Sequence, residues 1–139
     1  GATDVVDASQ KDVIHTVREL TDGAMVDLCV EAVGEAETFQ TAAHLSRFQG
    51  RLCLFGVPDH DLLPFPWFDI TNNETDIILS RGPGCRAYFQ TAVDMVATSH
   101  AALSGLVTPR LPWEMASDAF EMYANPGAHP GALKIVLEL

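Results

Sequence analysis

Segments of strand type and helix type alternate three times along this chain, and this alternation most limits how the chain can fold. Apolar runs typical of buried strands lie at residues 25–30, 51–57 and 76–80, and stretches with helical spacing separate or follow them. The connections between the runs are too long for hairpins, so the strands are expected to be parallel and covered by helices on both faces. The sequence therefore predicts an α/β fold.

The remaining segments complete this predicted order of elements. Residues 3–6 are β-prone and are expected to form a first strand, and a helix is predicted over 13–20. A second helix is expected to present Phe39, Ala42, Ala43 and Phe48 on one face and to end at Gly50. A third keeps helical spacing at Phe89, Ala92, Val93, Val96 and Ala97. A proline-flanked tail is expected to add a helix over 113–124 and a strand over 133–137.

Composition limits the kind of partner that this chain can bind. The chain has 139 residues, 47% of them hydrophobic, which suits one globular domain with a real core. Its formal net charge of −11 repels nucleic acid and anionic membrane surfaces. No apolar run reaches the roughly 20 residues of a membrane span, and the first residues lack a secretion signal. We therefore expect a cytoplasmic protein that binds neither nucleic acid nor membranes.

Local motifs do not reveal the chemistry. The sequence contains no Gly-x-Gly-x-x-Gly, no phosphate-loop lysine motif and no Gly-x-Ser-x-Gly. Cys29, Cys53 and Cys85 are odd in number and far apart, which indicates neither a disulfide framework nor a zinc site, and Cys85 is expected to be the most reactive thiol. The five histidines are isolated from one another and from the cysteines. No catalytic or metal-binding residue is predicted.

The ends of the predicted strands are the more informative places. Open parallel sheets bind ligands in the crevice beyond the carboxyl ends of their strands. Residues 31–34, 55–58 and 80–82 occupy these ends, and each stretch contains a glycine where the backbone could approach a flat ligand. One such glycine can equally serve turn geometry, but three such turns in register favour a dinucleotide crevice.

Four stretches resemble the C-terminal part of a zinc-dependent medium-chain dehydrogenase/reductase of the alcohol, polyol or threonine dehydrogenase type. They are Gly-Ala-Thr-Asp-Val-Val-Asp at 1–7, Val-Asp-Leu-Cys-Val-Glu-Ala-Val-Gly at 26–34, Gly-Arg-Leu-Cys-Leu-Phe-Gly-Val-Pro at 50–58 and Gly-Ala-Leu-Lys-Ile-Val-Leu at 131–137. The resemblance implies a partial Rossmann-type parallel sheet without its first two strands. Residues 1–108 would be the C-terminal part of the dinucleotide-binding domain, and 109–139 a tail returning toward the catalytic domain.

The resemblance also implies a cofactor and its contacts. NAD or NADP would be the cofactor of the parent enzyme, and zinc would lie in a catalytic domain that this sequence does not include. Ala32, Val33 and Gly34 would border the adenine side of the crevice, and Phe55, Gly56 and Val57 would face the nicotinamide. Ser80 and Arg81 occupy the matching place after the next strand, and Lys134 corresponds to a basic position that reaches the pyrophosphate in several relatives.

Three readings of function follow from these observations. The first is part of an NAD(P)-dependent oxidoreductase that oxidises an alcohol or polyol by hydride transfer, inactive as this chain alone. The second is a binding or assembly module that kept the fold and lost the chemistry. The third is part of a zinc-free quinone reductase. Because the expected first strand would lack its neighbours, we also expect a homo-oligomer formed through a sheet edge.

Overall fold

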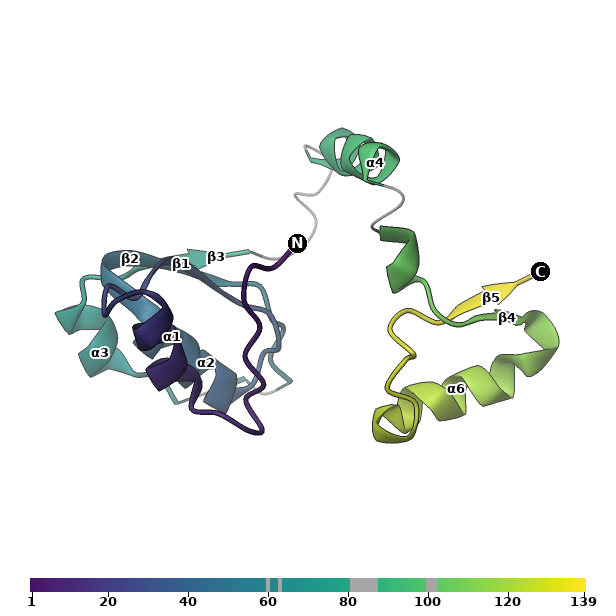
Figure 1. The fold of residues 1–139 in the computed structure, drawn as a ribbon, viewed down its shortest axis with the longest axis horizontal. Coiled ribbons are helices and arrows are strands. Elements are labelled where there is room, and N and C mark those ends of the chain that lie inside the picture. The colour runs from purple at the N-terminus through teal and green to yellow at the C-terminus, as the bar shows by residue number, and fades with distance from the viewer. Residues whose placement is uncertain (60, 63, 81–87, 100–102) are drawn as a thin grey trace. The chain divides into compact units, whose positions relative to one another are not determined.

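The chain forms two compact units, residues 1–82 and 83–139 (Figure 1). The structure is a computed structural model that describes residues 1–59, 61, 62, 64–80, 88–99 and 103–139. This division into compact units does not test the domain boundary that we expect after residue 108. The expected tail, residues 109–139, lies within the second unit. No helix in these ranges is long and apolar enough to cross a bilayer.

The first unit is built on a parallel sheet of three strands. Strands β1 (Val26–Glu31), β2 (Ser46–Leu54) and β3 (Asp76–Leu79) lie in the order β1-β2-β3. Cys29 pairs with Leu52 across the first two strands, and Leu52 pairs with Ile77 across the next two. The predicted parallel α/β arrangement is therefore confirmed as a partial Rossmann-like sheet.

Three helices connect and cover the sheet of this unit. They are α1 (Val13–Leu20), α2 (Ala36–Leu45) and α3 (Trp67–Asn72), and Figure 1 shows them on one side of the sheet. α2 packs Ala42 and Ala43 against Leu52, and Ile70 of α3 completes this buried cluster. Small residues on α2 let the helix approach the central strand closely, so the core lies between the sheet and α2.

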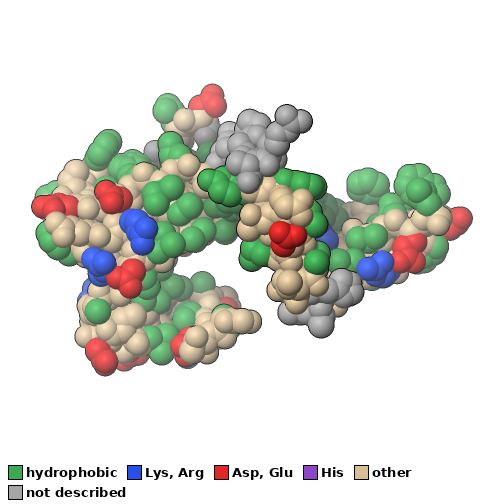
Figure 2. All heavy atoms as spheres, turned by 90° about the horizontal axis from the view of Figure 1, so that it is seen from above, with side chains coloured by type: hydrophobic (Ala, Val, Ile, Leu, Met, Phe, Trp, Pro, Cys, Tyr) green, Lys and Arg blue, Asp and Glu red, His purple; other side chains and the backbone are tan. Residues whose placement is uncertain are grey.

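The opposite face of the sheet differs from the sequence-based expectation. Leu28 and Val30 lie on one face of β1, and they are 47% and 55% exposed. The prediction that both faces of this strand are covered is wrong for the part of unit 1 that the structure describes. The continuous apolar run indicated burial correctly for one face only, because no described helix of this unit covers the other. Figure 2 likewise shows hydrophobic side chains at the surface.

Two local predictions fail for reasons of backbone geometry. Residues 3–6 do not form a strand, since no described strand lies beside them to supply hydrogen bonds. Phe48 does not continue the second helix, which ends at Leu45; it lies in β2 with 55% of its surface exposed. The glycine at 50 suggested a helix end, but it lies inside the strand, five residues after the helix ends.

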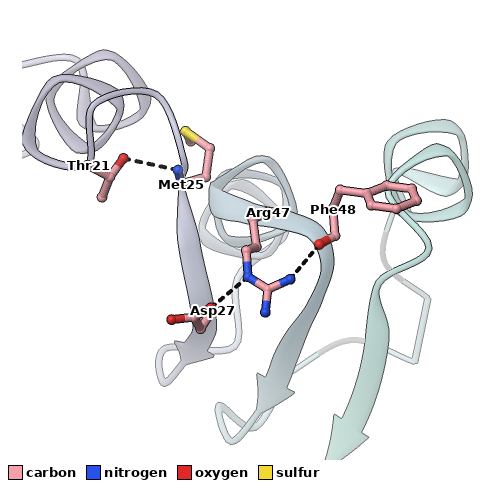
Figure 3. A network of polar contacts seen from close by, with 5 residues as sticks. All are labelled: Thr21, Met25, Asp27, Arg47 and Phe48. Atoms are coloured by element: carbon pink, nitrogen blue, oxygen red, sulfur yellow. Dashed lines mark hydrogen bonds and ion pairs between the residues drawn. The ribbon is translucent and has the colours of Figure 1, made fainter.

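The start of β2 is irregular and is tied to β1 by side chains (Figure 3). The pairing shifts between Val26 and Leu28, so the strand from Ser46 bends before regular pairing begins at Arg51. Arg47 donates from Nε to Asp27 Oδ1 at 2.6 Å and from Nη1 to the carbonyl of Phe48 at 2.7 Å. These bonds replace part of the strand ladder at the end opposite the predicted crevice.

The second unit contains a helix and a smaller parallel sheet. α4 (Phe89–Thr98) confirms the third predicted helix, and a 3-10 turn, η2, spans Ser104–Leu106. β4 (Arg110–Pro112) pairs with β5 (Val136–Glu138), and η3 (Trp113–Met115) leads into α6 (Ala116–Ala124) and then η4 (Pro126–Ala128). The tail helix and final strand were predicted within a few residues. β4 was not, because prolines flank it and normally indicate a break.

Candidate functional site

The turns after β1 and β2 meet at the carboxyl end of the sheet. Glu31 is the last residue of β1, and its backbone carbonyl accepts hydrogen bonds from the amides of Phe55 at 2.8 Å and Gly56 at 2.9 Å. Ser80 follows β3, and its amide donates to the carbonyl of Leu54 at 3.0 Å. The three strand ends named from the sequence are thus joined directly by backbone hydrogen bonds.

The side chain of Glu31 organises the first of these turns. Its Oε1 accepts hydrogen bonds from the amides of Val33 at 2.8 Å and Gly34 at 2.9 Å and from the hydroxyl of Thr38 at 2.8 Å. Glu31 is only 5% exposed. A buried carboxylate is stable only when it is well hydrogen-bonded, and these three donors supply that stabilisation.

The same contacts fix the ionisation of Glu31. Burial raises the pKa of its carboxyl, while the amides of Gly34 and Val33 and the hydroxyl of Thr38 together lower that pKa below its ordinary value of 4.5. The neighbouring Cys29 is affected in the other direction, because burial and the charge of Glu31 both raise the pKa of its thiol. At neutral pH Glu31 is therefore a carboxylate, and Cys29, two residues earlier in β1, keeps its thiol protonated.

Two glycines allow the turns to approach more closely than other residues would. Gly34 has φ +99°, and a Cβ built on it would lie 2.5 Å from the carbonyl oxygen of Val57. A Cβ on Gly56 would overlap the amide nitrogen of Gly34 and Oε2 of Glu31. Both positions need glycine. Gly34 needs it for its positive φ and for space, and Gly56 needs it for space alone. The sequence-based expectation of close backbone approach is thus met here.

A pocket of about 260 Å³ lies where these turns meet. Its walls combine the two glycines and Glu31 with apolar side chains from β2, β3 and α2; the full lining is Glu31, Gly34, Phe39, Leu54, Gly56, Pro58, Leu79 and Ser80. Phe39 in turn packs against Phe65 in a tilted arrangement, with ring centroids 5.4 Å apart. The volume suits one flat ring rather than a whole dinucleotide, since pockets that enclose drug-sized ligands have about 300–1,000 Å³.

The predicted site residues divide into four groups. Gly34, Gly56 and Ser80 line the pocket. Ala32, Val33, Phe55 and Val57 flank it in the same turns with exposed side chains. Lys134 lies in the second unit, where it is exposed and lines an apolar groove beside α6 and β5. Arg81 and Cys85 lie outside the described residues.

Sequence reasoning missed three residues that build this pocket. Glu31 and Phe39 line the pocket, and Thr38 lies behind Glu31 and donates a hydrogen bond to its carboxylate. One signal was available, since an acidic residue directly after an apolar parallel strand stands where the sheet binds ligands. Thr38 and Phe39 carried no comparable signal, because the first turns of helices often contain such residues.

A zinc site in a protein is a cluster of His, Cys, Asp or Glu side chains. Residues within the described ranges contain no group of three or more His, Cys, Asp or Glu side chains that could hold a metal ion. The described residues therefore offer no place for the zinc, which the family resemblance assigns to the catalytic domain. In contrast, the paired glycines and apolar walls fit one flat ring of a nicotinamide dinucleotide.

Comparison with known proteins identifies the family. Residues 1–98 match the family model described as zinc-binding dehydrogenase. A zinc-type alcohol dehydrogenase-like protein of Haemophilus influenzae is 31% identical over 114 residues, which are 82% of this chain and 32% of that protein. The chain thus spans about a third of the length of this relative.

Solved structures show the same fold. The alcohol dehydrogenase of Thermus sp. ATN1 superposes with a TM-score of 0.84 at 25% identity, covering 96% of this chain and 37% of that one. A zinc-binding dehydrogenase of Sinorhizobium meliloti bound to NADP gives a TM-score of 0.80 at 27% identity, covering 100% of this chain and 40% of that one. The resemblance seen in the strand ends is confirmed, and the chain belongs to the zinc-binding dehydrogenase family.

Proposed function

We propose that this chain supplies part of the cofactor pocket of an NAD(P)-dependent oxidoreductase that oxidises an alcohol or polyol by hydride transfer. The observation that carries the proposal is the meeting of Gly34 and Gly56 at a pocket beyond the strand ends. The nicotinamide, when bound, supplies the hydride acceptor. Zinc, where the parent enzyme uses it, would be held by residues other than those described here.

The chain's own groups would bind and orient one ring of the cofactor. Leu54 and Leu79 offer apolar surface to the ring, and the glycines let it approach the backbone. Ala32 and Val33 on the adenine side, Phe55 and Val57 beside the nicotinamide, and Arg81 after the third strand keep the roles implied by the resemblance. Lys134 would pair with the pyrophosphate through its charge.

We expect the isolated chain to bind the cofactor weakly and to lack dehydrogenase activity. Its sequence has no Gly-x-Gly-x-x-Gly turn to hold the cofactor phosphates, so most charge-assisted contacts are missing. Titration calorimetry with NAD⁺ and NADP⁺ should give dissociation constants weaker than about 100 μM. Alcohol-dependent formation of NADH or NADPH by the purified chain should not be detected.

Two results would contradict this proposal in different ways. A low micromolar dissociation constant would show that the phosphates are held within this chain after all. Alcohol oxidation that persists after chelation and repurification would show that the chain has complete catalytic machinery. Binding of neither nucleotide at about 10 mM would instead favour an assembly module that kept the fold without the cofactor.

A further inference from the structure

Glu31 is the one residue whose side chain and backbone together hold both turns of the described pocket. Its carboxylate accepts the three bonds from Val33, Gly34 and Thr38. Its backbone carbonyl accepts the two bonds from Phe55 and Gly56. Five donors from two turns and a helix therefore converge on a single residue at the end of β1.

The geometry of the carboxylate leaves its two oxygens with different contacts. Oε1 accepts all three hydrogen bonds that the carboxylate receives. Oε2 lies so close to Gly56 that a Cβ on this residue would overlap it. Among the described residues that line the pocket, only Glu31 carries a charge. The length of the Glu31 side chain matters, because the carboxylate must extend from the end of β1 to the amides of Val33 and Gly34 in the next turn.

We propose that Glu31 is a positioning residue for the cofactor ring, acting through Gly34 and Gly56 rather than by contact with the reacting atoms. By fixing the turn at Gly34, the carboxylate keeps this glycine against Val57 and holds the backbone wall of the pocket open to a flat ring. This inference rests on the proposed function, since it assigns the pocket to a cofactor ring. The positioning role of Glu31 goes beyond what the two glycines by themselves indicate.

Two substitutions separate the reach of Glu31 from its charge. Glu31→Asp keeps the charge but shortens the side chain by one methylene, about 1.5 Å, so the carboxylate no longer reaches the Val33 and Gly34 amides. Glu31→Gln keeps the length and an acceptor oxygen but removes the charge. Glu37→Gln is the matched control, because it removes an acidic charge from an exposed site in the first turn of α2, the helix that carries Thr38.

Hydrogen exchange and nucleotide binding, measured on the full chain by nuclear magnetic resonance, test the proposal. In Glu31→Asp the amides of Val33 and Gly34 should exchange about tenfold faster or more, matching the loss of one hydrogen bond, while Leu52 in the central strand keeps its rate. The dissociation constant for NAD⁺ should rise about tenfold in this variant. Glu31→Gln should retain binding within about threefold, and Glu37→Gln should match the wild type.

Each contrary outcome has a distinct meaning. Equal acceleration at Leu52 in Glu31→Asp would show a role in global stability and overturn the proposal. Unchanged NAD⁺ binding despite faster exchange at Gly34 would also overturn it, yet would leave the proposed function standing. Loss of binding in Glu31→Gln with binding retained in Glu31→Asp would assign the effect to charge rather than position and would overturn the proposal. Absence of NAD⁺ binding in the wild type would remove the proposed function and this inference together.

Discussion

Single residues at the pocket act mainly through the backbone that they shape. Gly34 and Gly56 contribute space, and the buried Glu31 contributes hydrogen bonds that hold their turns. The role of the glycines could be predicted from the sequence, because a glycine directly after a parallel strand serves either the geometry of the turn or a close approach of the backbone. Burial of the carboxylate could not, since Glu31 is stabilised by Thr38, seven residues later, and by turn amides whose direction only the fold defines.

Glu31 should make the stability of the first unit depend on acid. Its pKa is lower in the folded chain than the ordinary 4.5, so the folded state binds fewer protons than the unfolded state. The stabilisation is complete above about pH 5 and is lost as the pH falls through the folded pKa. The free energy of unfolding, measured with urea from pH 6 to pH 3, should therefore fall more steeply for the wild type than for Glu31→Gln. Parallel curves would exclude this contribution of Glu31.

At the scale of elements, the sequence predicts the positions of most strands and helices well. It predicts less well which faces are buried and where the elements end. The alternation of periodicities located β1, β3 and α4 within a few residues, and it located α2 with its end five residues too late. Within the described part of the first unit, the prediction that both faces of β1 are covered was wrong, because an apolar run in a strand does not indicate which neighbour covers each face. The early end of α2 was also missed, because Ser46 already pairs with Val26 of β1, a long-range contact that local periodicity does not indicate.

The contact between the turns after β1 and β2 should be sensitive to one methyl group. Gly34→Ala places a Cβ 2.5 Å from the Val57 carbonyl at a φ of +99°, so strain and overlap add. We expect a loss of about 1–3 kcal/mol in the free energy of unfolding, measured with urea. Gly127→Ala is the control, since nothing lies within 4 Å of its Cβ position and its φ is not positive. Equal stability of the two variants would contradict the close approach.

At the scale of the whole molecule, the first unit leaves two described sheet edges and one apolar face without cover. β1 and β3 are the outer strands of its three-stranded sheet, and Leu79 on β3 is 79% exposed. Unpaired strand edges are templates for association with another chain. The net charge of −11 opposes association, but salt screens such repulsion beyond about 8–10 Å, whereas edge pairing acts at contact.

We therefore expect the chain to form a dimer or larger species through a strand edge at moderate salt. Light scattering should report a mass above the 15.0 kDa of one chain. Leu79→Lys should lower that mass by placing a charge on the β3 edge. Val5→Lys, at an exposed position outside the strands, should leave it unchanged. A clean monomer at high protein concentration would contradict this expectation.

The central claim, that the pocket beyond the strand ends receives a ring of a nicotinamide cofactor, is tested most directly by mapping where NAD⁺ binds. In a titration of the isotope-labelled chain followed by amide chemical shifts, the account predicts saturable changes concentrated at Gly34, Gly56 and Ser80. The amides of Thr38 and Phe39, in the first turn of α2, should shift less, and those of Asp27 and Arg47, at the opposite end of the sheet, should not shift. Saturable changes centred away from the pocket, or none at about 10 mM NAD⁺, would contradict it.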